Sequence, residues 1–332
     1  HIGVLENYET LRSYESGIDH FESLFRIHPE ILACDLHPDY LATRYALARA
    51  ESENLPVFQV QHHHAHLAAC LADNGWPTGE PAIGVCLDGI GYGTDGAIWG
   101  GEFLIGGFKG FQRFAHLKYA PLPGGDAAVR KCSRMALAHL WTAGIPWEPD
   151  LIPLAEFSRQ ELEMLFHQLE KGLNAPLTSS MGRLFDAVSA LIGVRQTATY
   201  EGQAAIELEN SVDPHESGWY TFEFHDGEID PTELWRGILT DLRASIPTAI
   251  ISARFHNSVA RLVLDVCQAI TTATTINTVC LSGGVWQNMT LFNKTVPLLE
   301  KAGYTVLTHR QVPANDGGIA LGQAVIASYA AE

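Results

Sequence analysis

The sequence predicts an α/β protein of two lobes with a cleft between them. Residues 82–120 show a strand, a glycine-rich turn and a strand, which is typical of a β-hairpin. Helical periodicity dominates the middle of the chain, and strands alternate with helices from residue 276 onward. Hairpins with helices early and strand–helix alternation late favour two packed α/β units, and clefts between such units hold ligands.

The elements follow from local patterns. Residues 1–55 predict helices around a short buried strand in ILACDLHPDY (31–40), which ends in a polar loop. A second strand, LPVFQVQ (55–61), ends where a helix is expected to begin. Further helices are expected at 127–143, 157–171, 179–193, 200–210, 231–244 and 247–273, with one intervening strand, WYTFEFH. The last segment predicts a strand in INTVCLSGGV, a helix at 286–301, a strand in YTVLTH and a helix at 317–330.

Composition excludes several classes of function. The chain has 38 acidic and 21 basic residues, a net charge of −17, which argues against a nucleic-acid surface. It has no apolar run long enough to cross a membrane and no signal peptide. The six cysteines form no Cys-x-x-Cys pair, so a reduced, cytoplasmic setting is expected. Because the first residue is histidine, the chain is expected to be a fragment of a longer protein.

Four histidines stand close together in QHHHAH. If a helix begins here, His62 and His66 lie at positions i and i+4 on one face and can share a metal ion. The zincin motif H-E-x-x-H needs a glutamate where this chain has His63, so a metalloprotease is disfavoured. His63 and His64 point elsewhere and are better candidates for groups behind the ligands.

Two glycine motifs predict a nucleotide site, and a third glycine pair follows Asp316. In LDGIGYGTDG, Asp88 ends an apolar strand, and Gly89, Gly91 and Gly93 allow the backbone to approach an anion, as in sugar kinases, actin and chaperone ATPases.

In CLSGGVWQN, Gly283 and Gly284 stand at a helix start, and Asn288 can hydrogen-bond a ribose or a base. In NDGG, Asp316 is either a helix N-cap or a metal ligand.

These motifs in this order resemble the C-terminal carbamoyltransferase domain of the HypF family of NiFe-hydrogenase maturation. The resemblance is carried by H-x-x-x-H, the glycine-rich hairpin, SSMGRLFDAVSALIG, YEGQAAIELE, LSGGVWQN and NDGG together. This domain is similar to the tRNA threonylcarbamoyl-transferring enzymes, whereas QHHHAHLAA, DLHPDY and HIGVLEN are specific to HypF and its nearest relatives. The resemblance implies an actin/Hsp70/sugar-kinase-like fold with nucleotide and metal in the interlobe cleft. It further implies one lobe of residues 1–122 plus the helix 311–332, and another of residues 123–310 with the adenosine motifs.

The resemblance also implies roles for individual residues. The metal ligands fall on His62, His66, Asp88 and Asp316, a donor set that suits zinc or iron.

The nucleotide contacts of the related enzymes fall on Asp88, Gly89, Gly91, Gly93, Asp186, Gly202, Gly283, Gly284 and Asn288. Without the resemblance, Asp186 reads as a solvated helix carboxylate.

The implied reaction passes a carbamoyl group to a partner. An upstream domain makes carbamoyl-adenylate from carbamoyl phosphate and ATP, and this domain transfers the carbamoyl group to the C-terminal cysteine of HypE. Asp88 stands at the reacting centre, AMP leaves, and the glycine N–H groups can hold its charge. His37 and His256 are candidates for activating the thiol or orienting the carbamoyl group, and a structural role is equally open.

Some features depart from the family pattern. The tRNA-modifying relatives carry a glutamate where this chain has His64, which argues against a tRNA substrate. The KCSR segment replaces an expected Pro-Trp pair, which leaves Cys132 and Ser133 without an assigned role. The neighbouring Arg130, Lys131 and Arg134 either attract an anion or are simply solvated.

Two alternatives remain open. An O-carbamoyltransferase acting on a small-molecule hydroxyl would share the fold, the metal and the adenylate. A small-molecule kinase of the same superfamily is the weaker alternative, since it needs a catalytic aspartate near the γ-phosphate and no histidine pair.

Overall fold

The computed structural model describes residues 5 and 7–331, so most of the HIGVLEN motif lies outside the described residues. The N-terminal part is a small α/β unit. Its elements are α1 (Tyr8–Phe25), β1 (Leu32–Asp35), α2 (Leu41–Glu53) and β2 (Val57–Val60). The two strands pair in parallel, with Asp35 opposite Val60. Their carboxyl ends therefore meet at one edge, immediately before α3 (His62–Asp73) begins.

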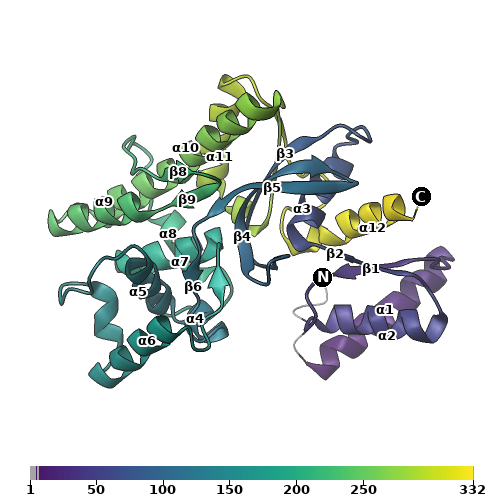
Figure 1. The fold of residues 1–332 in the computed structure, drawn as a ribbon, viewed down its shortest axis with the longest axis horizontal. Coiled ribbons are helices and arrows are strands. Elements are labelled where there is room, and N and C mark those ends of the chain that lie inside the picture. Colours follow the sequence, from purple (N-terminus) through teal and green to yellow (C-terminus); the bar gives the residue numbers. More distant parts are fainter. Residues whose placement is uncertain (1–4, 6, 332) are drawn as a thin grey trace.

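A mixed sheet forms the centre of the molecule (Figure 1). Its main strands run in the spatial order β11 (Thr305–Leu307), β10 (Thr278–Ser282), β3 (Ala82–Tyr92), β4 (Ile98–Gly107), β5 (Gly110–Leu117), β9 (Glu228–Asp230) and β8 (Glu223–His225). The short β6 (Ala120–Pro121) and β7 (Leu177–Thr178) pair beside β4. β3 and β4 form the predicted antiparallel hairpin, and β10 pairs in parallel with β3, so the glycine loops after both strands lie at one edge.

Helices cover both faces of this sheet. On one face, alternate β3 residues such as Val85 and Leu87 join the large core formed with α5 (Cys132–Thr142), α7 (Met181–Leu191) and α10 (Thr248–Thr274). On the other face, Cys86 packs with Leu67 and Leu71 of α3 and with the last helix, α12 (Ile319–Ala330). Figure 1 shows α12 beside α3. At Gly322 a Cβ would clash with the carbonyl oxygen of Ala65, so only glycine allows this close approach.

The remaining helices form the rest of the molecule. They are α4 (Asp126–Arg130), α5 (Cys132–Thr142), α6 (Arg159–Lys171), α7 (Met181–Leu191), α8 (Gln203–Asn210), α9 (Thr232–Arg243), α10 (Thr248–Thr274) and α11 (Met289–Lys301). Single 3₁₀ turns, η1 (Ile152–Glu156), η2 (Gly284–Gln287) and η3 (Asp316–Gly318), connect them. No helix within the described ranges is long and apolar enough to cross a membrane.

Two elements differ from the sequence prediction. The helix expected at 127–143 is divided at Lys131, because the carbonyl of Arg130 accepts from the N–H of Ala198 and the N–H of Ser133 donates to Gln196. The strand expected over WYTFEFH is limited to Glu223–His225. The N–H of Tyr220 instead donates to the Ser258 hydroxyl of α10, at 2.7 Å, and is not available to a neighbouring strand. The lobe boundary at residue 122 stays a prediction; β3 and β10, from its two sides, share one sheet.

Candidate metal and nucleotide site

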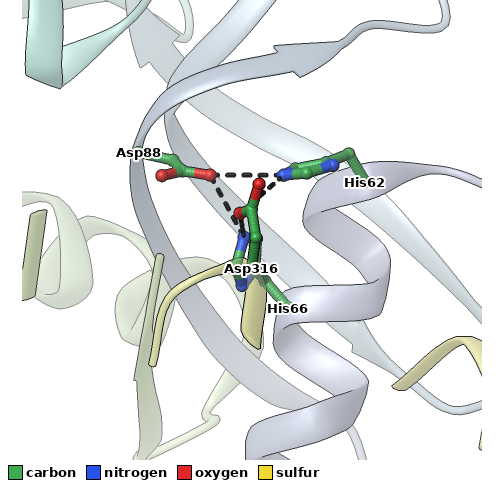
Figure 2. A group of neighbouring side chains, drawn as sticks. All are labelled: His62, His66, Asp88 and Asp316. Atoms are coloured by element: carbon green, nitrogen blue, oxygen red, sulfur yellow. Dashed lines mark hydrogen bonds and ion pairs between the residues drawn. The ribbon is translucent and has the colours of Figure 1, made fainter. Parts of the chain in front are cut away.

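Four side chains that are distant in sequence converge at the sheet edge (Figure 2). His62 and His66 lie one turn apart at the start of α3, Asp88 lies in β3, and Asp316 begins η3. Each offers one ligand atom, and all four atoms lie within 4.8 Å of one another. The Asp88 carboxylate is 3.3 Å from His62 Nε2 and 3.1 Å from His66 Nε2. Two imidazoles and two carboxylates at this spacing fit a zinc or iron(II) ion.

The four groups differ in solvent exposure. The side chains of His62 and His66 are 2% and 1% exposed, whereas that of Asp316 is 65% exposed. Asp316 Oδ1 still lies 3.5 Å from His62 Nε2 and 3.4 Å from His66 Nε2. The two histidines of the centre are therefore buried, and the centre faces solvent on the Asp316 side, where a substrate can approach.

Buried carboxylates and imidazoles change one another's proton affinity. Burial alone lowers the pKa of His62, but its hydrogen bonds to Asp316, Asp35 and Asp88 outweigh burial and hold that pKa well above the ordinary value. Burial alone raises the pKa of Asp88, but its contacts with the two histidines hold it well below the usual range. The metal-free centre thus retains protons between the imidazoles and the carboxylates, and a cation must displace them.

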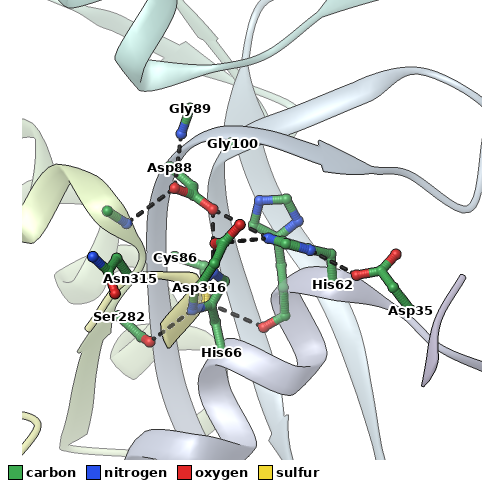
Figure 3. Close-up of polar contacts among 12 residues, drawn as sticks. Asp35, His62, His66, Cys86, Asp88, Gly89, Gly100, Ser282, Asn315 and Asp316 are labelled. Atoms are coloured by element: carbon green, nitrogen blue, oxygen red, sulfur yellow. Dashed lines mark hydrogen bonds and ion pairs between the residues drawn. The ribbon is translucent and has the colours of Figure 1, made fainter. Parts of the chain in front are cut away.

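Each ligand histidine is oriented through its second ring nitrogen (Figure 3). Asp35 Oδ2 accepts from His62 Nδ1 at 2.7 Å, which directs Nε2 toward the centre. His66 Nδ1 contacts the Ser282 hydroxyl at 3.3 Å, and Ser282 contacts His309 Nε2 at 2.8 Å. The sequence analysis did not assign these supporting residues. The available signal for Asp35 was its place at the end of a buried strand parallel to the one that precedes the histidines.

The other two histidines of the cluster, His63 and His64, make contacts that hold α3 against the sheet. His64 Nε2 contacts the carbonyl of Gly107 at 2.7 Å and ties α3 to β4. His63 is buried, and burial holds its pKa well below the ordinary value, so its ring is neutral. Its ring lies against Gly91, where a Cβ would also come within 2.7 Å of His62 Cδ2. Gly91 is therefore needed for the close approach of β3 to the histidines.

The predicted phosphate loop is joined directly to the metal centre. Asp88 Oδ1 accepts from the N–H of Gly89 at 2.8 Å and from the N–H of Gly284 at 3.0 Å. Gly283, with φ at 103°, sits so close to β3 that a Cβ would clash with the Leu87 carbonyl oxygen. The glycine pair thus allows the turn that follows β10 to contact Asp88. These two N–H groups, which the sequence analysis assigned to phosphate, are used to orient Asp88.

Other predicted nucleotide residues make contacts of their own. Asp186 Oδ2 accepts from Arg183 Nε at 2.7 Å inside α7. Gly93 packs against Trp99 and Asp95 at the hairpin turn, and Gly202 precedes α8 with φ at 74°. Their roles toward a nucleotide stay predictions.

Asn288 and the predicted catalytic residue His256 form a buried pair. Asn288 caps α11 through Oδ1, and its Nδ2 donates to His256 Nε2 at 2.9 Å. The other ring nitrogen of His256 donates to the Ser252 carbonyl at 2.8 Å. With both nitrogens engaged, His256 orients Asn288, and its catalytic role stays a prediction.

The predicted catalytic residue His37 lies near the centre. The backbone N–H of His37 donates to Asp35 Oδ1 at 2.8 Å, while Asp35 Oδ2 accepts from His62 Nδ1. The His37 ring stacks on Tyr40, with centroids 4.2 Å apart, and its edge lies 5.1 Å from the Tyr92 ring. This arrangement places His37 on the same carboxylate as a metal ligand.

The basic residues beside PGGD lie elsewhere. Arg130, Lys131 and Arg134 line a pocket together with Phe157 and two acidic side chains. Lys131 Nζ donates to the Glu156 carbonyl at 2.8 Å and lies over the Phe157 ring. All six cysteines are buried, and burial raises the pKa of Cys132 to about 12. A buried, protonated thiol does not act as a nucleophile at neutral pH.

Comparison with known families identifies this kind of domain. A family model described as "Carbamoyltransferase, Kae1-like Domain, second subdomain" matches residues 84–323, and one described as "HypF Kae1-like domain" matches residues 1–73. The fold and the site therefore define a Kae1-like α/β domain. More specifically, the chain belongs to the HypF family.

Individual relatives agree with this assignment. "Carbamoyltransferase HypF" of Rhodobacter capsulatus is 40% identical, with 99% of this chain and 43% of that protein covered. A "Carbamoyltransferase HypF homolog" of Cupriavidus necator is 36% identical, with 90% of this chain and 78% of that protein covered. The chain thus spans less than half the length of its longer curated relatives.

Solved structures of HypF confirm the predicted α/β fold. A full-length HypF in the phosphate- and nucleotide-bound form superposes with a TM-score of 0.93 at 41% identity, covering 100% of this chain and 52% of that one. HypF of T. kodakarensis superposes with a TM-score of 0.89 at 30% identity, covering 99% of this chain and 44% of that one.

Proposed function

We propose that this chain transfers a carbamoyl group from carbamoyl-adenylate to the C-terminal cysteine thiol of HypE, in the synthesis of the cyanide ligand of NiFe hydrogenases. The observation that carries the proposal is the convergence of His62, His66, Asp88 and Asp316 next to the Gly283–Gly284 turn. The phosphate- and nucleotide-bound form of a HypF with the same fold supports an adenylate as donor. In this proposal, a separate upstream domain makes the donor from carbamoyl phosphate and ATP.

The proposed metal is zinc or iron(II), held by the two histidines and the two aspartates. When bound, it supplies a Lewis acid for the carbamoyl carbonyl. The chain's residues provide the geometry: Asp35 orients His62, while the N–H groups of Gly89 and Gly284 hold the Asp88 carboxylate in one orientation. A rigid centre holds the donor carbonyl in one direction, which lowers the entropic cost of the transfer.

The acceptor thiol comes from outside this chain. Its six cysteines are buried, so no thiolate of the chain itself can reach the donor. The incoming thiolate attacks the carbamoyl carbon, the bond between that carbon and the phosphate oxygen breaks, and AMP leaves. His37, whose backbone N–H donates to the Asp35 carboxylate that holds His62, is the proposed group for receiving the thiol proton.

The test supplies synthetic carbamoyl-adenylate and HypE to the purified chain and measures the mass of HypE. The wild type is expected to add one carbamoyl group to the terminal cysteine, and a HypE variant lacking that cysteine is expected to stay unmodified. His62→Ala and His66→Ala are expected to abolish transfer, while His167→Ala, on the exposed face of α6, serves as the matched control. Absence of transfer by the wild type, or full transfer by both variants, contradicts the proposal.

A further inference from the structure

Four of the glycine N–H groups predicted to contact the nucleotide already donate within the protein. The N–H groups of Gly89 and Gly284 both donate to Asp88 Oδ1. The N–H of Gly93 donates to Ala97 within the hairpin, and the N–H of Gly283 donates to Ala314. The cationic side chain nearest to Gly89 is therefore the first candidate for a phosphate donor.

That cation is Arg183, in the first turn of α7. Its residue is 6% exposed, and its Nε donates to Asp186 Oδ2 at 2.7 Å. Within residues 5 and 7–331, the Nη1 and Nη2 groups of this guanidinium, which are hydrogen-bond donors, make no hydrogen bond. The terminal nitrogens lie 3.9 and 4.0 Å from the point where a Cβ on Gly89 would sit. The free end of the guanidinium thus faces Gly89, in the irregular part of β3 that directly follows Asp88.

The position of Arg183 is held firmly. Ser180 caps α7 by accepting from the Arg183 N–H at 3.1 Å, and its hydroxyl lies 3.0 Å from the Asp88 carbonyl and 2.5 Å from the Gly89 carbonyl. A Cβ on Gly182 would come within 2.9 Å of the Gly89 Cα, so α7 packs directly on this part of β3. Arg183 and Asp88 are therefore parts of one rigid unit.

We infer that Arg183 binds the phosphate of the adenylate, with Asp186 as the positioning residue that orients its guanidinium. A buried ion pair contributes little net stability, because desolvation offsets the attraction, so stability alone does not account for this pair. The planar guanidinium fork is suited to two oxygens of a phosphate. This assignment also gives Asp186 a contact with Arg183 in place of the predicted direct contact with the nucleotide.

The inference rests on the proposed function and adds a role in the transfer step. When the bond between the carbamoyl carbon and the phosphate oxygen breaks, its electron pair remains on that oxygen, and the phosphate of AMP gains a negative charge. Arg183 stabilises this charge, so it acts on the leaving group and not on the incoming thiolate.

The test compares the binding of AMP and of adenosine by isothermal titration calorimetry. Arg183→Ala is expected to weaken AMP binding about 10- to 100-fold and to change adenosine binding by less than about twofold, because charge-assisted hydrogen bonds to phosphate have this magnitude. Asp186→Asn is expected to weaken AMP binding to a smaller extent. Arg236→Ala, an exposed arginine of α9, is the matched control.

The outcomes separate this inference from the proposed function. Unchanged AMP binding by Arg183→Ala, an equal loss for AMP and adenosine, or no AMP binding by the wild type overturns it. If the alanine variant does not fold, Arg183→Lys keeps the charge but not the fork, and it is expected to show the same AMP-selective loss to a lesser degree; an unselective loss in this folded variant also overturns the inference. AMP-selective loss with no carbamoyl transfer by the wild type would retain the phosphate site and reject only the transfer reaction.

Discussion

Asp35 and His62 form a 2.7 Å hydrogen bond that joins the small N-terminal sheet to the candidate metal centre. Asp35 ends β1, and His62 begins the helix that follows β2, the parallel neighbour of β1. Because the carboxylate accepts from Nδ1, the proton is kept there and Nε2 is left to bind a metal. The orientation of a metal ligand therefore depends on a strand 27 residues away in sequence.

Asp35→Ala is expected to weaken zinc or iron(II) binding about 10- to 100-fold, the usual effect of removing a carboxylate that orients a ligand histidine. Competition with a chromophoric chelator measures this affinity without any catalytic assay. Asp39→Ala is the control, since the carboxylate of Asp39 pairs with the exposed Arg44. Equal affinities for the wild type and Asp35→Ala would show that the hydrogen bond has no influence on the metal.

The parts of this site that the sequence predicts are those whose contacts lie close together in the chain. The pairing of His62 with His66 is local, so helical spacing was sufficient. Asp88 and Asp316 were found through the resemblance, because no local pattern connects a β-strand residue with one 228 positions later. Asp35 was missed because it reaches His62 only through the pairing of two strands.

The fold shows the same limit. The hairpin and the final alternation of strands and helices follow from periodicity within single segments, and both are present. The division at Lys131 depends on hydrogen bonds from residues 196 and 198, which periodicity does not contain. The predicted nucleotide contacts include Asp186 but not Arg183, because the sequence did not show that the two side chains are paired.

The metal-free protein is expected to lose stability as pH rises above neutrality. His62 has a pKa held well above its ordinary value, despite burial, by hydrogen bonds to carboxylates. A raised folded pKa gives stability that is fully present below the unfolded value, about 6.5, and is lost as pH rises through the folded pKa. Urea unfolding of chelator-treated protein at a series of pH values measures this loss.

The comparison that isolates the centre is the double variant His62→Ala with His66→Ala. Removing both imidazoles is expected to flatten the dependence of the free energy of unfolding on pH in this range. At acidic pH the opposite sign applies, because the pKa of Asp88 is depressed: its contribution is present above about pH 4 and is lost as pH falls through the folded pKa. A double variant with the slope of the wild type above neutrality would assign the effect to other groups.

Gly283→Ala is expected to destabilise the protein more than a glycine substitution at a comparable backbone angle. Gly283 has φ at 103°, and its added Cβ would also meet the Leu87 carbonyl. Gly303 has φ at 93° with open space around it, so Gly303→Ala measures the backbone strain alone, about 1–3 kcal/mol. The steric contact is expected to add about 1–3 kcal/mol at Gly283. Denaturant unfolding of the two variants gives the difference, and equal losses would contradict the close packing of the turn on β3.

Asn288→Ala separates a structural role from a nucleotide contact. Losing the cap of α11 costs about 1 kcal/mol, and leaving His256 Nε2 buried without a donor costs about 1–3 kcal/mol more. Ser158→Ala, which removes the exposed cap of α6, is expected to cost only about 1 kcal/mol and is the control. Asn288→Asp keeps the capping oxygen but not the N–H donor to His256. Its loss in free energy of unfolding should therefore lie between those of Ser158→Ala and Asn288→Ala. If adenosine binding falls sharply in Asn288→Ala while its free energy of unfolding matches the wild type, Asn288 serves the nucleotide and not the fold.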